Sequence, residues 1–537
     1  MNKSQSGPKE ERWWQARDYT PETLDRAERV LAEIRAGSQV FDAIRHHPLP
    51  DGGYLGKHML VAVYNLKTRS GEWEPDPALL TQIRMKPRRT LSGVTVVTVL
   101  TKPYPCPGEC IFCPTNDEMP KSYLPDEPGA MRALYHEYDP YNQVQARIQA
   151  LEAVGHPTDK IELLILGGTW CAYPQDYQEW FVRRCFDAMN KVDSLTLAEA
   201  HSLNETATHR NVGLAIETRP DRVTVRNLAW LRSLGITKVQ MGVQSLDDRI
   251  LALNRRGHTL ADTTQAVDLL RAAGFKIVLH WMPNLLGATL ASDQEDFRRL
   301  WQHLCPDELK IYPTQLLENT ELYNVWKQGK YTPYSTDELI NLIADIKTAI
   351  PRYCRVNRVV RDIPSTNIVA GNKRTSLRQD IQREMRQRGT HCQCIRCREV
   401  HKQHVTPSSL HLTEFTYQAG DIKEHFISFV SGDDKLVGFL RLALPGMQAP
   451  DTGIEELRQA AIIREVHIYG QSLPLSEEHN GAAQHIGLGT ELIDRAEEIA
   501  RQSGYPHLAV ISAVGTRRYY LERGFQRGEL YLIKPLA

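Results

Sequence analysis

The sequence predicts an α/β protein in which a barrel-like parallel sheet is followed by a separate α+β domain. Short β-rich runs alternate with helix-length amphipathic segments between residues 93 and 314, and strands connected in this way pair in parallel. From residue 408 onward strand-like runs dominate, with one strong helix at 489–501. The chain has 537 residues, 41% of them hydrophobic, so it can form several buried cores.

Residues 1–90 are predicted to form a small helical domain, which is also a candidate RNA-binding segment. Thr20 and Pro21 begin its first helix and Gly37 ends it. The apolar positions that recur at helical spacing between them are Leu24, Ala27, Val30, Leu31 and Ile34. A short basic cluster near the end of this region is either a solvated loop or an RNA contact. Its members are Lys86, Arg88 and Arg89.

Residues 91–335 are predicted to form a full or partial (β/α) barrel. The expected strands cover residues 93–100, 160–168, 211–218, 238–245, 275–283 and 307–314. The helices between them are expected near 141–154, 175–189, 223–235, 260–273 and 293–304. Barrels of this kind place their chemistry at the C-terminal ends of the strands. We therefore expect the functional residues at those ends.

Residues 336–407 are predicted to be a basic linker to the α+β domain at 408–537. The chain is neutral overall, with 65 Lys and Arg against 65 Asp and Glu. Residues 352–405, however, contain 13 basic and 4 acidic residues, whereas 408–537 contain 12 and 17. A basic helix in the linker is either a solvated helix with internal ion pairs or a dock for RNA phosphates. Its candidate RNA contacts are Arg374, Arg378, Arg383 and Arg386.

The ten cysteines are too few for a disulfide scaffold in a chain of this length. No apolar run is long enough to span a bilayer, and the first residues lack the apolar core of a secretory signal. We therefore expect a cytoplasmic protein that makes no membrane contact and keeps its thiols reduced. Three cysteines are expected to serve only in packing, and these are Cys171, Cys185 and Cys354.

The first cysteine cluster, Cys106, Cys110 and Cys113, directly follows the first barrel strand. Iron–sulfur clusters commonly use four cysteines, and three thiolates would leave one iron of a four-iron cluster open for a cofactor. A structural zinc completed by a distant residue is the alternative.

The second cluster, Cys392, Cys394 and Cys397, lies in the basic linker. Close thiol spacing in a small loop-rich segment favours a structural zinc. Free buried thiols are the alternative. The sequence leaves the fourth ligand open among His391, His401, His404 and Cys305.

A glycine-containing loop precedes the strong helix of the C-terminal domain. Backbone amides at such a helix N-terminus can bind an anion, although glycine at a helix start is often only structural. Two tyrosines downstream are either half-buried packing residues or part of the same site, and these are Tyr519 and Tyr520. The loop consists of Gln484, His485, Ile486, Gly487, Leu488 and Gly489.

The C-x3-C-x2-C loop after the first barrel strand resembles that of the radical S-adenosylmethionine (radical SAM) superfamily. The resemblance implies a 4Fe-4S cluster that reduces S-adenosylmethionine to methionine and a 5′-deoxyadenosyl radical. Gly167, Gly168 and Thr169 match the superfamily's contact with the methionine amino group, with Thr169 where an acidic residue is common. The Q-x-x-G-x-G loop resembles the pyrophosphate-binding loop of the GNAT acetyltransferase family, which implies acetyl-CoA.

Together the two halves resemble the catalytic subunit of the Elongator family, which modifies the tRNA wobble uridine. The resemblance runs from about residue 86 to the C-terminus and includes the runs LILGGT, IETRPD, GVQS, RGH, KIYPT, RDIP, REVHIYG, QHIGLG and AVGTRRYY. It implies a stand-alone prokaryotic-type member that forms 5-carboxymethyluridine from acetyl-CoA and uridine 34. In the mechanism proposed for the family, the radical removes a hydrogen atom from the acetyl methyl group. That carbon then adds to uracil C5, and the thioester is hydrolysed.

The resemblance also implies roles for individual residues and partners. Catalytic roles fall on the first cysteine cluster and on Tyr519 and Tyr520, the tyrosines near the CoA sulfur. The expected partners are the anticodon stem-loop of tRNA, acetyl-CoA and an electron donor, and a homodimer stays open. The candidate cofactor contacts at strand ends are Glu217, Arg219, Gln244 and Lys310, and His280 is a further rim residue.

Two other functions are compatible with the same residues. One is a protein lysine acetyltransferase with a structural iron–sulfur cluster, and the other is a tRNA-binding scaffold without turnover. The open three-thiol loop and the basic linker favour the radical enzyme over both.

Overall fold

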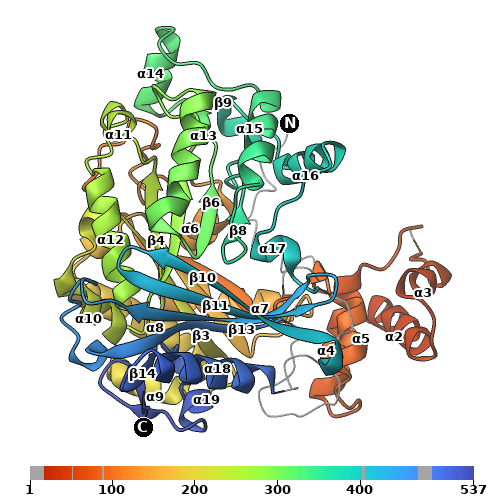
Figure 1. Cartoon of the computed structure of the whole chain (residues 1–537). Coiled ribbons are helices and arrows are strands. Elements are labelled where there is room, and N and C mark those ends of the chain that lie inside the picture. Colours follow the sequence, from red (N-terminus) through yellow and green to blue (C-terminus); the bar gives the residue numbers. More distant parts are fainter. Residues whose placement is uncertain (1–16, 51, 88–89, 402–405, 470–486, 537) are drawn as a thin grey trace.

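The computed structural model describes residues 17–50, 52–87, 90–401, 406–469 and 487–536 (Figure 1). Some of the residues singled out in the sequence lie outside the described residues. They are Arg88, Arg89, His404, Gln484, His485 and Ile486.

In the described residues, four helices precede the first strand and project from one side of the molecule (Figure 1). The predicted N-terminal cap is confirmed, because Thr20 Oγ1 accepts a hydrogen bond from the Thr23 amide at 3.3 Å. The apolar faces of these helices form a small core of their own. The helices are α2 (Pro21–Arg35), α3 (Val40–His46), α4 (Lys57–Arg69) and α5 (Pro77–Ile83).

A seven-stranded parallel sheet forms the centre of the molecule. Its order is β1-β2-β3-β4-β5-β6-β8, and β1 and β8 are unpaired edges, so the barrel is partial. We call this sheet the half-barrel. The six predicted strands are confirmed, and β8 is an additional one. Their bounds are β1 (Thr95–Leu100), β2 (Lys160–Leu166), β3 (Arg210–Thr218), β4 (Lys238–Gln244), β5 (Lys276–Trp281), β6 (Glu308–Ile311) and β8 (Arg355–Arg358).

Helices connect successive strands of the half-barrel, as parallel pairing requires. Several begin with a side-chain cap, and Thr259 and Asp262 form a reciprocal capping box at the start of α12. The helices are α6 (Pro128–Tyr135), α7 (Pro140–Glu152), α8 (Gln175–Asn190), α9 (Leu197–Asn204), α10 (Val225–Ser233), α11 (Asp248–Leu253), α12 (Leu260–Ala272), α13 (Leu290–Arg299), α14 (Glu321–Lys327) and α15 (Thr336–Lys347).

The segment 336–407, which we predicted to be a linker, also contributes a strand to the half-barrel. β8 pairs in parallel with β6, so this segment extends the sheet as well as joining it to the C-terminal domain. Strand β9 (Ile368–Ala370) of this segment forms a short antiparallel pair with β7 (Leu316–Leu317). Besides α15, the segment contains the helices α16 (Leu377–Gln387) and α17 (Ile395–Arg398).

The C-terminal sheet has the order β10-β11-β12-β13-β14-β16-β15. We expected it to be antiparallel, but β13 and β14 pair in parallel because α18 forms a crossover between them. The strands are β10 (Leu410–Ala419), β11 (Ile422–Ser431), β12 (Leu436–Pro445), β13 (Ala460–Ile468), β14 (His507–Val510), β15 (Gln526–Arg527) and β16 (Leu532–Pro535). The helices are α18 (Leu488–Gln502) and α19 (Arg517–Leu521).

The half-barrel and the C-terminal sheet share one apolar core. Buried ion pairs also join them: Arg464 of β13 contacts Asp307 at 2.5 Å, and Arg271 of α12 contacts Glu424 of β11 at 3.1 Å. All four side chains are almost completely buried. The helices of the described residues include none that combines the length and apolar character of a membrane span.

Candidate active site

A cavity of about 2130 Å³ extends through the interior of the half-barrel to the C-terminal sheet. At one end it is lined by the first cysteine cluster, and at the other by residues of β13 and by Tyr520. The cavity thus connects the two regions to which the sequence assigned chemistry. The predicted site residues that line it are Lys86, Cys106, Cys110, Cys113, Gly168, Thr169, Glu217, Arg219, Gln244, His280, Lys310, Arg378, Cys397, His401 and Tyr520.

The first cysteine cluster lies on the loop that follows β1. A hydrogen bond from the Cys113 thiol lowers the pKa of Cys110 to about 5, and the charges of Arg256 and Arg219 add to this effect. Arg256 Nη1 donates to Cys110 Sγ at 3.0 Å. Since thiolates are the metal-binding form of cysteine, this environment favours metal binding.

The turn after β2 brings Thr169 to the same loop. Gly167 has a φ of 140°, and a β-carbon there would collide with the Thr101 hydroxyl, so only glycine fits. The turn places Thr169 Oγ1 3.7 Å from Cys106 Sγ. The predicted glycine turn is therefore adjacent to the cysteine loop.

Polar residues at the ends of β3, β5 and β6 face one another across the cavity. Glu217 accepts hydrogen bonds from Tyr123 Oη at 2.8 Å and from Lys310 Nζ at 3.4 Å. His280 Nε2 lies 3.2 Å from Gln240 Oε1, and burial, followed by the charge of Lys310, holds the pKa of His280 well below its usual range. A neutral imidazole and a paired carboxylate therefore line this part of the cavity.

Several residues that line the cavity have a buried polar atom without a hydrogen-bond partner among the described residues. Those at the ends of β3 and β4 are Thr218 Oγ1, Arg219 Nη1 and Gln244 Oε1. Leaving such an atom unpaired costs about 1–3 kcal/mol. Donors and acceptors for a polar cofactor are thus already in place beside the cysteine loop, which fits S-adenosylmethionine.

The two cysteine clusters differ in geometry. Among the described residues, the Cys392, Cys394 and Cys397 thiols form a compact group with all sulfur atoms within 4.8 Å. Thiolates on one tetrahedral zinc, at about 2.3 Å from the metal, are roughly 4 Å apart. In the first cluster, by contrast, Cys113 is hydrogen-bonded to Cys110, and the Cys106 thiol lies beside Thr169 instead of joining a compact group of three. The compact second group therefore fits one tetrahedral ion, and the first cluster is distinguished by its position at the cavity beside unpaired polar atoms.

Of the four predicted fourth ligands, the three that the structure describes do not join the compact group. His391 and His401 are exposed and lie outside it, and Cys305 donates to the Trp301 carbonyl at 3.4 Å instead. The charged neighbour of the compact group is Lys347 of α15. Its side chain is 1% exposed, and its Nζ has no hydrogen-bond partner among the described residues. Hydrogen bonds from the neighbouring thiols, and then the ammonium of Lys347, hold the pKa of Cys394 well below its usual range.

The described part of the glycine loop contacts one of the two predicted tyrosines. Gly487 caps α18 in the left-handed conformation, with φ of 80°. A β-carbon at Gly489 would collide with the hydroxyl of Tyr519, so this glycine allows the tyrosine to approach the helix N-terminus. Tyr520 is 7% exposed and lines the cavity.

β13 and β14 pair only over residues 460–463 and 507–510. β13 continues to Ile468 beyond the end of this pairing. The backbone of residues 464–468 is therefore unpaired on the side of β14, near the cavity.

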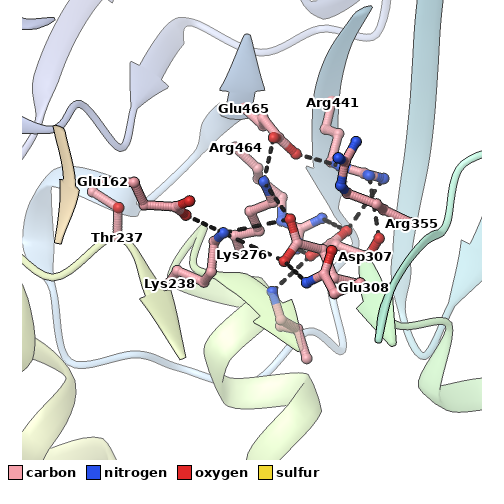
Figure 2. A network of polar contacts seen from close by, with 12 residues as sticks. Glu162, Thr237, Lys238, Lys276, Asp307, Glu308, Arg355, Arg441, Arg464 and Glu465 are labelled. Atoms are coloured by element: carbon pink, nitrogen blue, oxygen red, sulfur yellow. Dashed lines mark hydrogen bonds and ion pairs between the residues drawn. The ribbon is translucent and has the colours of Figure 1, made fainter. Parts of the chain in front are cut away.

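A network of charged side chains crosses the cavity between the two sheets (Figure 2). Lys238 binds Glu162 and also Glu308 at 3.3 Å. Lys276 binds Glu308 at 2.8 Å and Glu465 of β13. Sequence reasoning missed the network, because its members come from strands far apart in the chain.

The predicted RNA-binding arginines occupy different positions. Arg378 lines the cavity, whereas Arg374, Arg383 and Arg386 are exposed and do not line it. Arg383 also forms an ion pair with Asp380 at 3.3 Å. Sequence reasoning missed several other basic residues that line the cavity. Two of them, Arg358 and Arg361, lie at or just after the end of β8, and this position at a strand end could have identified them. The missed residues are Arg132, Arg147, Arg256, Arg358, Arg361 and Arg396.

Comparisons with known proteins agree with this site. The family model of the Radical SAM superfamily matches residues 104–300, and that of the Radical_SAM C-terminal domain matches 306–387. The tRNA uridine(34) acetyltransferase of Dehalococcoides mccartyi is 44% identical over 454 residues, which cover 83% of this chain and 99% of the relative. Human Elongator complex protein 3 is 36% identical over 480 residues, which cover 85% and 87%.

A solved structure also matches most of the chain. The archaeal Methanocaldococcus infernus Elp3 with an N-terminal deletion superposes with a TM-score of 0.71 at 36% identity. The match covers 83% of this chain and 99% of that structure.

Proposed function

Because the chain belongs to the family of tRNA uridine(34) acetyltransferases and Elongator complex protein 3, we propose that it makes 5-carboxymethyluridine at the tRNA wobble position from acetyl-CoA. The radical SAM half-barrel makes it an enzyme of tRNA modification. The observation that carries the proposal is the single cavity that connects the first cysteine cluster with β13 and Tyr520.

Cys106, Cys110 and Cys113 would hold the 4Fe-4S cluster. The unpaired atoms of Thr218, Arg219 and Gln244 would bind S-adenosylmethionine, together with the turn at Gly167–Thr169 and with Glu217 and Lys310. When bound, this pair supplies a carbon radical that can remove a hydrogen atom from an unactivated methyl group. An external one-electron donor would be required.

We assign acetyl-CoA to the C-terminal sheet, which would be a GNAT-type domain. The amides at the start of α18, next to Gly487 and Gly489, would bind its pyrophosphate, since a helix N-terminus favours negative charge. Tyr519 approaches this helix end and Tyr520 faces the cavity, so both are placed to act near the thioester. The unpaired edge of β13 offers hydrogen bonds to an extended ligand.

The RNA base would enter the same cavity. The anticodon loop is single-stranded, so its bases can be splayed out at low cost. Basic residues from several elements line the cavity and would contact the phosphates, and Lys86 and Arg378 are among them. The network of Figure 2 keeps the interior polar, which suits a reaction that ends with hydrolysis of a thioester.

The compact thiol group would hold a structural zinc that fixes the segment around α17. Its donor set fits zinc, since three sulfurs lie close enough for one tetrahedral ion.

The experiment uses anaerobically reconstituted protein with tRNA, acetyl-CoA, S-adenosylmethionine and a reductant. We expect 5-carboxymethyluridine and 5′-deoxyadenosine by mass spectrometry. 5-Carboxymethyluridine should be absent when acetyl-CoA is omitted, and 5′-deoxyadenosine should be absent when S-adenosylmethionine is omitted. Transfer of label from [methyl-13C]acetyl-CoA to the uridine would identify the carbon source. Unmodified tRNA together with acetyl-lysine on added protein would contradict the proposal and favour a protein acetyltransferase.

A further inference from the structure

Two arginines on one wall of the cavity have no carboxylate partner within ion-pair distance among the described residues. Arg378 lies on α16 and Arg396 on α17, and both line the cavity. Arg378 Nη2 donates to the Val356 carbonyl at 3.2 Å, and Arg396 Nη1 donates to the Asn357 carbonyl at 3.1 Å. Carbonyls of neighbouring residues of the edge strand β8 thus anchor the two guanidinium groups, which are close enough for the charge of Arg396 to lower the pKa of Arg378.

No ion pair compensates the charges of these two arginines. Burial, followed by the charge of Arg396, lowers the pKa of Arg378 to about 10, and burial followed by the charge of Arg355 lowers the pKa of Arg396 against the opposing effect of Glu399 and of the second-cluster thiols. The acids closest in sequence form ion pairs with other residues, Asp380 with Arg374 and Arg383 and Glu399 with Arg355. On the same wall Arg358 is neutralised by Asp362 at 2.7 Å. Two positive groups that repel each other and retain free N–H donors are a binding site for an anion.

Phosphate fits this site better than other anions. A guanidinium group binds phosphate oxygens through two parallel hydrogen bonds, and backbone anchoring fixes its orientation in advance. The side chains of Gln379 and Gln382 also line the cavity from α16 and can add neutral hydrogen bonds.

We propose that Arg378 and Arg396 form a clamp for one backbone phosphate of the RNA whose base enters the cavity. The inference rests on the proposed function and names a contact of that substrate. The phosphates of CoA share this chemistry, but we assign them to the start of α18, and Gly487 and Leu488 there do not line the cavity.

The first experiment compares two double variants that each remove two arginines. Arg378→Gln with Arg396→Gln removes the clamp, whereas Arg298→Gln with Arg458→Gln removes the same charge from exposed positions outside the cavity. We expect the first variant to bind tRNA about 10-fold more weakly at about 100 mM salt. Its plot of log K against log salt should be shallower by about 0.7–0.9, as for the loss of one phosphate contact. The second variant should bind within about twofold of wild type.

Further measurements distinguish the loss of a phosphate contact from a loss of acetyl-CoA binding or of metal. The loss should appear mainly in KM for tRNA, affinity for acetyl-CoA should stay unchanged, and zinc and iron contents should equal those of wild type. Arg378→Lys with Arg396→Lys keeps the charge but not the paired donors, and should bind with intermediate affinity.

Several results would overturn the clamp. They are wild-type tRNA affinity in the first variant, equal loss in both variants, and a loss for acetyl-CoA alone, which would assign the phosphate to CoA. Failure of the wild-type protein itself to bind or modify tRNA would instead overturn the proposed function.

Discussion

The two cysteine clusters show how the same residue type serves two different sites. Both contain three cysteines within eight residues. All three thiols of the first cluster line the cavity, next to arginines and unpaired polar atoms, whereas the second is a compact group with a buried lysine as its charged neighbour and only Cys397 at the cavity. The groups around the sulfur atoms are therefore the physical basis for proposing a different metal at each cluster.

The largest effect is expected from Cys110→Ser. Because the first cluster would supply the radical, the variant should lose uridine modification by more than about 1,000-fold and bind less iron. Quantitative mass spectrometry of tRNA nucleosides and iron analysis measure both. Cys305→Ala, a thiol outside both clusters, is the matched control and should retain activity. Modification by Cys110→Ser at the wild-type rate would rule out the radical route.

A smaller loss is expected from Cys394→Ser in the second cluster. The variant should lose its zinc and melt several degrees lower, because a structural metal contributes folding free energy. Its KM for tRNA should rise about 10-fold, since Arg396 lies between two of the three thiols, but its iron content should not change. Metal analysis, calorimetry and kinetics check this. An unchanged melting temperature would show that the second cluster is not structural.

Lys347→Met should weaken the metal site of the second cluster. Three thiolates on one divalent ion leave a negative charge that the ammonium offsets, so zinc should dissociate to a chelator about 5- to 30-fold faster. In the zinc-free protein the same change should raise the pKa of Cys394, because the ammonium of Lys347 helps to hold that pKa below its usual range. Lys347→Arg keeps the charge and serves as control. Equal zinc dissociation in all three proteins would contradict this role.

The smallest effect is expected in the pH dependence of cysteine labelling. The pKa of Cys110 is lowered to about 5 by the Cys113 thiol and the two arginines, so its thiolate predominates above that pH. In metal-free reduced protein, iodoacetamide should label Cys110 already near pH 6, whereas burial and donation to Cys110 raise the pKa of Cys113. Arg256→Gln should move the Cys110 profile to higher pH. Labelling of Cys110 only above pH 8 would show an ordinary thiol.

The sequence was sufficient for the features that depend on local pattern. Apolar runs separated by amphipathic helices predicted the six strands β1 to β6, and cysteine spacing predicted two different metal sites. β8 was missed because Arg355 and Arg358 gave its short run the character of a charged linker. The parallel pair of β13 and β14 was missed because pairing direction depends on where the helix between them packs.

The candidate site was predictable only where it follows strand ends. Glu217, Gln244 and Lys310 belong to such ends and line the cavity. The network of Lys238, Lys276 and Glu308 could not be predicted, because three separate strands bring these charges together. The clamp residue Arg396 depends in the same way on carbonyls of a strand about forty residues earlier.

The buried ion pairs between the half-barrel and the C-terminal sheet have a consequence for the evolution of the chain. If the C-terminal sheet were separated, Asp307 and Arg271 would keep their charges in an apolar surface without partners. Neither the half-barrel nor the C-terminal sheet could therefore be transferred to another protein without further changes. Natural recombination would have to replace both faces of this contact at once, so the two halves are expected to have been inherited as a single unit.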